Sequence, residues 1–227
     1  MSLVLAIASA TPEVSVAVGE PGAAVIGEIA LQPGRRHGEV LAPAIESLCR
    51  LTGIELGDVG IVAVDVGPGL FTGLRVGVAT AKALAFGLGI PMVTGSSLGL
   101  LAHPLAGDGR PVVAVVDARR GEVFWARFAP RGEGSEPVAP PAVAAPAALA
   151  AALGSDPCLL VGDGARRYAE LFDALPGAAI APRPFDHPRA ASLIDLALTG
   201  PVVEVGDVTP LYLRGADVRI GWEQRDG

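Results

Sequence analysis

The chain has 227 residues, of which 51% are hydrophobic and 4% aromatic, so its core must be built mainly from aliphatic side chains. Its formal net charge of −7 argues against binding nucleic acid alone, because phosphate contacts require clustered Lys and Arg. The two cysteines, Cys49 and Cys158, lack Cys-x-x-Cys spacing, which argues against a disulfide scaffold or a cysteine zinc site. We expect a cytoplasmic protein.

The N-terminal part of the chain predicts strands followed by helices. Short apolar runs at 3–9, 14–19 and 24–30, separated by turn residues, predict an antiparallel meander. The first run has no preceding basic region and predicts a strand rather than a signal peptide. The elements expected next are a helix over 38–53 that ends at Gly53, a buried strand at 61–66, a helix over about 72–88 and a strand near 91–94.

Residues 72–90 form the most apolar stretch, but Arg75 and Lys82 interrupt it. Each charge would cost roughly 2.5–3.5 kcal/mol at the centre of a membrane. We therefore expect a soluble helix and no membrane partner.

The second half repeats the pattern of the first. A polar, turn-rich segment at 103–110 marks a boundary, which divides the chain into lobes 1–106 and 107–227. Strands are expected at 111–119, 122–128 and from 158, and helices within 142–154, 165–175 and 189–200, before a terminal segment at 209–214. Two α/β lobes that each open with a hairpin resemble the fold of actin, sugar kinases and heat-shock ATPases.

The segment GPGLFTGLR at 67–75 allows two interpretations. It matches neither the Walker nor the dinucleotide-binding glycine pattern, but a loop at a helix start can still hold an anion. The first strand ends in Ala8-Ser9-Ala10-Thr11, where nucleotide-binding members of this fold place an acidic residue that orients magnesium. An anion or nucleotide loop is therefore the minority interpretation; its residues would be Gly67, Pro68, Gly69, Thr72 and Arg75.

Small residues recur every four positions along the following helix, at Gly73, Gly77, Ala81 and Ala85. Such a row lets another backbone approach closely. It indicates either close packing on the chain's own sheet or a contact with a second subunit.

The segment GPGLFTGLRVGVATAKALAFGLGIPMVTGSSL at 67–98 closely resembles the bacterial TsaB family, as do LAIASAT at 5–11, HGEVLAPAIESL at 37–48, VVAVVDARRGEVFWARF at 112–128 and PLYLR at 210–214. The resemblance implies an accessory subunit of the tRNA threonylcarbamoyladenosine machinery, beside a catalytic paralogue, TsaD. That paralogue holds a metal with two histidines, and the corresponding positions here are Ser97 and Leu101. We therefore expect no catalytic residue, metal or cofactor in this chain, with ATP or ADP only at a complex interface.

The resemblance also implies a partner face on the helices over 38–53 and 72–88. The residues it assigns to this face are His37, Glu39, Leu41, Ile45, Gly73, Leu74, Gly77, Val78, Ala81 and Ala85. The implied partners are a TsaD-type catalytic subunit and a TsaE-type ATPase, with tRNA reached through the complex and a homodimer formed when the chain is alone. His37 with Glu39, and Asp117 with Arg119 and Glu122, look like active-site groups, but helix-start and strand-turn roles are favoured.

Three alternatives remain open at this point. An ATP-binding kinase or ATPase of the same fold would have to act without an acidic residue at Ala8. A metallopeptidase would need metal ligands that the sequence does not supply. A free-standing homodimer with a separate binding role is the third alternative.

Overall fold

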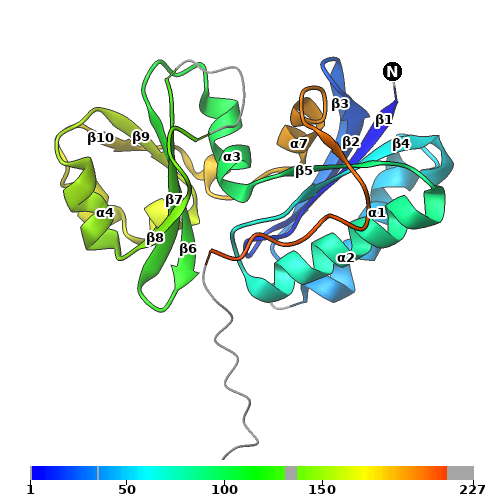
Figure 1. Cartoon of the computed structure of the whole chain (residues 1–227), viewed down its shortest axis with the longest axis horizontal. Helices are drawn as coiled ribbons and strands as arrows, with labels where there is room; N and C mark the ends of the chain where they lie inside the picture. The colour runs from blue at the N-terminus through cyan, green and yellow to red at the C-terminus, as the bar shows by residue number, and fades with distance from the viewer. Residues whose placement is uncertain (1, 35, 131–136, 214–227) are drawn as a thin grey trace, which may run out of the picture.

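The computed structural model describes residues 2–34, 36–130 and 137–213, which form two lobes lying side by side (Figure 1). Each lobe contains one sheet. The first sheet has six strands in the order β11-β5-β4-β1-β2-β3, and the second has five in the order β10-β9-β6-β7-β8.

The first sheet begins with the expected meander. β1 (Leu3–Ala8), β2 (Val14–Glu20) and β3 (Ala24–Leu31) pair antiparallel in sequence. β4 (Val59–Asp65) follows the short helix η1 (Leu56–Asp58) and pairs parallel with β1. β5 (Met92–Gly95) then pairs parallel with β4. Because β1 is central and covered on both faces, five of its six residues are buried.

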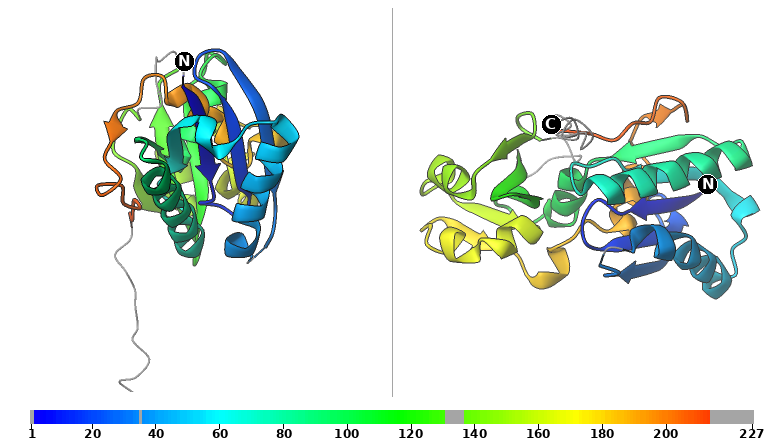
Figure 2. Two further views of the ribbon diagram at one scale, coloured as in Figure 1. Left: turned by 90° about the vertical axis from the view of Figure 1, so that its right-hand side faces the viewer. Right: turned by 90° about the horizontal axis from the view of Figure 1, so that it is seen from below.

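Helices cover both faces of this sheet. α1 (His37–Thr52) and α2 (Phe71–Leu88) lie side by side on one face (Figure 2). α7 (Ala190–Leu196) covers the other face. Alternate residues of β1 point to the two layers: Leu5 and Ile7 pack in the α1–α2 core, and Ala6 packs in the α7 core. Gly53 ends α1 with a φ of 71°, the left-handed value expected of a terminating glycine.

The second lobe is built on a similar plan. α3 (Ser97–Ala102) and η2 (His103–Leu105) lead into the hairpin of β6 (Val112–Arg119) and β7 (Glu122–Phe128). The elements that follow are β8 (Ala142–Ala144), α4 (Pro146–Leu153), β9 (Cys158–Val161), α5 (Asp163–Arg167), α6 (Ala169–Phe172), β10 (Ala178–Ile180) and η3 (Arg183–Phe185). α3 packs on one face of this sheet, and α4 and α6 pack on the other.

Two segments of the second lobe differ from the sequence prediction. Residues 142–144 are a strand rather than part of the helix, because Pro146 suits the first turn of a helix and α4 starts there. The helix expected over 165–175 is divided at Tyr168, whose φ and ψ of −110° and 31° are not helical.

The chain crosses between the lobes twice, which corrects the expected division at residue 106. After η3 the chain returns to the first lobe, where α7 covers the sheet and β11 (Val202–Val203) pairs antiparallel with β5. Residues 204–213 then run along α2 (Figure 2). Lys82 Nζ donates to the carbonyl oxygens of Gly206 and Val208 at 3.3 and 3.0 Å. The second lobe is therefore an insertion between α3 and α7.

Candidate functional site

The loop between β4 and α2, residues 67–70, presses against the turn after β1. Its Gly67–Pro68 peptide bond is cis. The Leu70 N–H donates to the Ala10 carbonyl oxygen at 2.6 Å. A Cβ built on Gly69 would overlap that same oxygen. Glycine is required at this position because two backbone segments are in direct contact.

The backbone groups of this loop are largely used within the chain. Gly67 N–H donates to Asp65 Oδ1 at 2.8 Å, and the Gly67 carbonyl accepts from Ser97 N–H at 2.9 Å. The Leu70 N–H also donates within the chain. The N–H groups of Gly67 and Leu70, which an anion would need as donors, therefore already have acceptors. Thr72 and Arg75 are exposed. The anion loop stays a prediction, and this geometry does not favour it.

Asp65 lies under the loop and was missed by the sequence analysis. Its side chain is buried, and its Oδ1 accepts hydrogen bonds from Ser97 Oγ and Gly67 N–H. Its Oδ2 has no partner among the described residues. Burial raises the pKa of Asp65 to about 7, although both hydrogen bonds act in the opposite direction. An acidic residue closing the apolar run IVAVDV was the signal that could have identified it.

Arg75 belongs to an aromatic cluster at the start of α2. Its guanidinium lies 3.8 Å from the centre of the Phe71 ring, and its Nε donates to the Tyr212 hydroxyl at 3.2 Å. The two rings are 5.5 Å apart. The C-terminal segment is thereby fixed to the helix start, and Leu211 N–H donates to the Val66 carbonyl at 2.7 Å beside it.

His37 connects α1 to the same turn after β1. Its Nε2 donates to the Thr11 carbonyl oxygen at 2.8 Å, and the side chain is buried. Ser9 Oγ donates to the Gly73 carbonyl oxygen at 2.9 Å and so joins the turn to α2. Glu39 is exposed, and its carboxylate makes no hydrogen bond with the described residues; only its backbone N–H does, to the Arg36 carbonyl oxygen at 3.0 Å. His37 and Glu39 therefore do not form a catalytic pair; His37 positions the start of α1.

The residues assigned to the partner face lie mostly inside the first lobe. Of the ten, only Glu39 is exposed; buried are His37, Leu41, Ile45, Gly73, Leu74, Gly77, Val78, Ala81 and Ala85. A Cβ built on Gly73 would overlap the Ser9 carbonyl oxygen, and one on Gly77 would overlap Ser9 Oγ. The row of small residues is therefore required for packing within the chain. The expectation of a partner face on α1 and α2 stays a prediction, but its direct contacts must come from other residues.

The outward surface of α1 and α2, which we call the α1–α2 face, is lined by other residues. On α2 the exposed residues include Phe71, Thr72, Arg75, Ala79, Ala83, Phe86 and Gly87, and on α1 they include Gly38, Glu39, Ala42, Pro43, Glu46, Arg50 and Leu51. Phe86 is 81% exposed and Leu51 76%. Large apolar side chains in solvent beside small residues are typical of a surface that contacts another protein.

The two apolar faces of α2 also explain its composition. Within the described part of the chain it is the one helix long and apolar enough to cross a membrane by length and composition. Its inward face packs on the first sheet, and Arg75 and Lys82 contact the C-terminal segment.

Polar side chains gather at the strand ends of the second lobe as well. Asp117 Oδ2 lies 3.0 Å from Arg119 Nη1 and 3.7 Å from Arg167 Nη1, and Asp163 Oδ1 accepts from Asp117 N–H. Burial raises the pKa of Asp163 to about 6, and Asp117 adds to the shift. Arg119 and Arg120 have φ of 62° and 55°, which is the left-handed backbone of a tight hairpin turn. These residues form a strand-end turn network, as the sequence analysis favoured.

Ser97 and Leu101, the positions that the resemblance pairs with metal ligands of the catalytic paralogue, make contacts within the chain. Ser97 Oγ donates to Asp65 Oδ1 at 2.7 Å, and Leu101 is buried in the second-lobe core. His103 lies 3.3 Å from Asp195. In the described ranges, no three His, Cys, Asp or Glu side chains are grouped as they would be around a metal ion.

Comparisons with known sequences agree with one another on the family of this chain. Residues 25–170 match the family model of TsaD, tRNA N6-adenosine threonylcarbamoyltransferase. An uncharacterised protein of Mycobacterium bovis is 36% identical over 96% of this chain and 95% of its own length. The tRNA threonylcarbamoyladenosine biosynthesis protein TsaB of Haemophilus influenzae is 28% identical over 85% of each chain. TsaB of Escherichia coli is 36% identical over 55% of this chain and 54% of its own.

Solved structures agree with this family. YeaZ from Pseudomonas aeruginosa superimposes with a TM-score of 0.80 at 28% identity, covering 94% of this chain and all of its own. The ethanolamine utilization protein EutJ of Carboxydothermus hydrogenoformans, at 13% identity and a TM-score of 0.53, shares the fold alone. The α/β fold of two lobes is therefore the actin-like fold expected from the sequence. By sequence and by structure, the chain belongs to the TsaD family and, within it, to the TsaB proteins.

Proposed function

We propose that this chain is a non-catalytic subunit of the machinery that makes threonylcarbamoyladenosine in tRNA, and that its α1–α2 face binds a TsaD-type catalytic subunit. The TsaB relatives support the pathway. The observation that carries the pairing is the α1–α2 face itself, where Phe86 and Leu51 lie 81% and 76% exposed.

The composition of the α1–α2 face suits a helix-to-helix contact. Ala79, Ala83 and Phe86 follow one another at spacings of four and three along α2, so they share one side of the helix. Small residues permit close approach, and Phe86 would be the anchor that a partner's pocket buries. Because a partner of the same family carries the corresponding helices, a four-helix contact is the arrangement that we propose.

The proposal that the chain is not itself an enzyme rests on the hydrogen bonds that its reactive side chains make within the chain. Ser9 Oγ and His37 Nε2 both donate to backbone carbonyls inside the first lobe, and neither contacts the other in a hydrogen bond. Ser97 and Leu101 cannot replace two imidazole ligands. These contacts favour an accessory role over a peptidase.

The ATPase alternative is disfavoured by the end of β1. Ala8 is buried there and offers no carboxylate to orient a hydrated magnesium ion. Calorimetry of the chain with ATP and magnesium tests this alternative. We expect no binding heat at micromolar concentrations, and tight binding would favour a nucleotide-dependent enzyme.

The remaining partners follow from the same proposal. We propose that a TsaE-type ATPase joins the pair, that tRNA is held mainly by the other subunits, and that the chain alone forms a homodimer through the same face. The net charge of −7 supports a subunit that leaves phosphate contacts to others. We propose a cytoplasmic location for the complex.

Deletion of the gene, followed by mass spectrometry of tRNA nucleosides, tests the function directly. We expect threonylcarbamoyladenosine to be lost and to return with the parent gene on a plasmid. A plasmid encoding Phe86→Asp should fail to restore it, whereas the matched surface variant Leu198→Asp, at a side chain 59% exposed elsewhere, should restore it. Normal nucleoside levels after the deletion would contradict the proposed function.

A further inference from the structure

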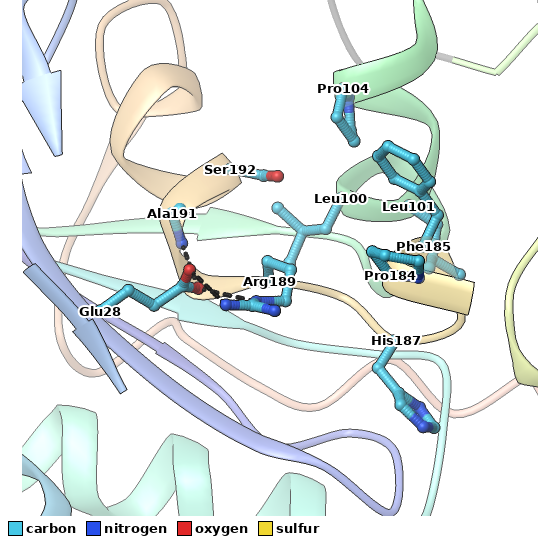
Figure 3. A pocket seen from close by; sticks show the side chains of 10 residues that line it. All are labelled: Glu28, Leu100, Leu101, Pro104, Pro184, Phe185, His187, Arg189, Ala191 and Ser192. Carbon is cyan, nitrogen blue, oxygen red and sulfur yellow. Dashed lines mark hydrogen bonds and ion pairs between the residues drawn. The ribbon is translucent and has the colours of Figure 1, made fainter. Parts of the chain in front are cut away.

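The second connection between the lobes, residues 186–189, is tied to each lobe by an ion pair. At its start, Asp186 accepts hydrogen bonds from Nε and Nη2 of Arg166, on α5 of the second lobe, at 3.2 Å each. At its end, Arg189 donates to Glu28, on β3 of the first lobe, through Nε at 3.1 Å and through Nη2 at 2.7 Å (Figure 3). One short segment therefore holds both lobes.

Between these two ion pairs, a histidine and a glutamate each bury one atom that has no hydrogen-bond partner in the described ranges. The atoms are Nδ1 of His187, on the connection, and Oε1 of Glu13, in the turn after β1. Arg189 Nε lies 3.9 Å from Glu13 Oε1, which is beyond hydrogen-bond distance. A buried polar atom without a partner is costly. Since a carboxylate oxygen accepts and an imidazole N–H donates, each of these atoms is a suitable partner for the other.

The charges around His187 leave Glu13 as the anion that it faces. Glu13 and Asp186 both favour a protonated His187, whereas burial of the ring opposes them and lowers the pKa of His187. Asp186 and Glu28 are already neutralised by their arginines, Arg166 and Arg189. A proton gained by His187 would therefore place a cation opposite a carboxylate that lacks a hydrogen bond at Oε1.

A pocket of about 190 Å³ lies beside the second connection, and His187 forms part of its lining (Figure 3). The pocket also meets the Glu28–Arg189 ion pair, and its other walls carry no charge. Apolar side chains of both lobe connections line it: Leu100, Leu101, Pro104, Pro184 and Phe185. Protein interiors are normally close-packed, so a cavity of this size leaves the connection room to shift.

We propose that His187 and Glu13 form a latch between the lobes. A small shift of the second connection closes it by bringing His187 Nδ1–H to Glu13 Oε1, and protonation of His187 strengthens it. The closed latch joins the first lobe to a connection that Asp186 fixes to the second lobe, so it restrains the lobes against each other.

The latch should respond to pH in one direction. In the open arrangement, burial keeps the pKa of His187 below its ordinary value of 6.5, so this arrangement loses stability as the pH falls below 6.5. The closed arrangement gains a charge-assisted hydrogen bond under the same conditions. Acid therefore favours the closed latch.

A pH titration of the imidazole nitrogen shifts in the full-length isotope-labelled protein tests the latch. Glu13→Gln should lower the pKa of His187 by about 1, the effect of removing a nearby opposite charge. Glu20→Gln, the same exchange at an exposed residue of β2, should leave that pKa unchanged. His103, which lies beside Asp195, should titrate identically in the parent and in both variants.

Residual dipolar couplings of the two lobes give a second measurement. In the parent, the range of lobe orientations should be narrower at about pH 5 than at about pH 8, because the latch closes as His187 gains its proton. His187→Asn places an uncharged amide near the Nδ1 position and should remove this difference. If Glu13→Gln does not fold, the parent and His187→Asn still decide the proposal.

Three outcomes would each overturn the latch. The first is a His187 pKa that is the same in Glu13→Gln and the parent. The second is an equal change of that pKa in Glu20→Gln. The third is a range of lobe orientations that depends on pH equally in the parent and in His187→Asn, or in neither.

Discussion

The inward and outward faces of α2 are both apolar, but they are built from residues of different size. The inward face carries Gly73, Gly77, Ala81 and Ala85, where the turn after β1 and the first sheet leave little space. The outward face carries Phe71 and Phe86 beside small residues, and nothing in the described chain buries Phe86. The small residues of α2 are therefore explained by packing inside this protein, whereas its exposed large side chains are where we propose that a partner binds.

Gly77→Arg should destabilise the protein most, because it disrupts the packing of the inward face of α2. A side chain at this position would overlap Ser9 Oγ, so the helix cannot stay on its sheet. We expect a loss of more than about 4 kcal/mol in the free energy of unfolding, or no folded protein, because overpacking of a buried site belongs to the most damaging substitutions. Urea unfolding followed by circular dichroism measures it. A stably folded Gly77→Arg protein would contradict the packing described for α2.

Asp65→Asn tests the buried carboxyl under the loop between β4 and α2. Asp65 has a folded pKa of about 7 against an ordinary value of 3.8, so the folded state keeps the proton after the unfolded state has lost it. Its contribution to stability is therefore present below about pH 4, declines as the pH rises to about 7 and is level above that.

The asparagine variant lacks this dependence. Its stability relative to the parent should rise by up to a few kcal/mol between pH 4 and pH 8, measured by urea unfolding at each pH. A difference between variant and parent that does not change with pH would contradict the raised pKa.

Gly77→Ala and Ser9→Ala together test whether Ser9 is what excludes a side chain at position 77 on the inward face. In the parent, the new methyl group of Gly77→Ala overlaps Ser9 Oγ, and its next neighbours are at ordinary distances of 3.5 and 3.7 Å. Gly77→Ala alone should therefore destabilise the protein. In the Ser9→Ala background it should be neutral or stabilising, because alanine favours a helix over glycine by about 1 kcal/mol.

A double-mutant cycle of unfolding free energies checks this prediction. We expect a coupling of about 1–3 kcal/mol, as for residues in direct contact. Additive effects would show that Ser9 is not what excludes a side chain at position 77.

Ala83→Arg on the outward face should have the smallest effect on stability. The residue is exposed, so the free energy of unfolding should stay within about 0.5 kcal/mol of the parent. Thermal unfolding measures it, with Ala81→Arg, at a buried position of the same helix turn, as the matched control. If Ala83→Arg destabilised the isolated chain as much as Ala81→Arg, the face would be part of the core and not a surface for a partner.

Much of the fold was predictable from the sequence, because short apolar runs between turn residues indicate β1 to β7 and β9, whereas the short strands β8, β10 and β11 were not predicted. The meander of β1 to β3 and the ends of α1 and α2 at Gly53 and Gly89 follow from local residue preferences. The return of α7 and β11 to the first lobe was not predictable in this way. It depends on contacts between distant residues, such as Arg189 with Glu28 and β11 with β5.

The sequence analysis assigned a partner face to α1 and α2, which stays a prediction, but most of the residues it named for that face are buried. Periodicity identifies the row Gly73, Gly77, Ala81 and Ala85, but a row of small residues has the same pattern whether it meets a sheet or a partner. The contact of Ser9 with α2 shows that this row packs inside the chain, and the two contacting residues lie 64 positions apart in the sequence. Asp65 was overlooked because one acidic residue in an apolar run does not show whether its carboxyl is buried.

The affinity of the purified chain for the TsaD-type protein of the same genome tests the central claim most directly. We predict that Phe86→Asp weakens this binding by at least about thirtyfold, the effect of losing an anchor of about 2 kcal/mol, while Leu198→Asp binds as the parent does. Equal affinity of Phe86→Asp and the parent, measured by calorimetry on folded proteins, would contradict the assignment of the α1–α2 face.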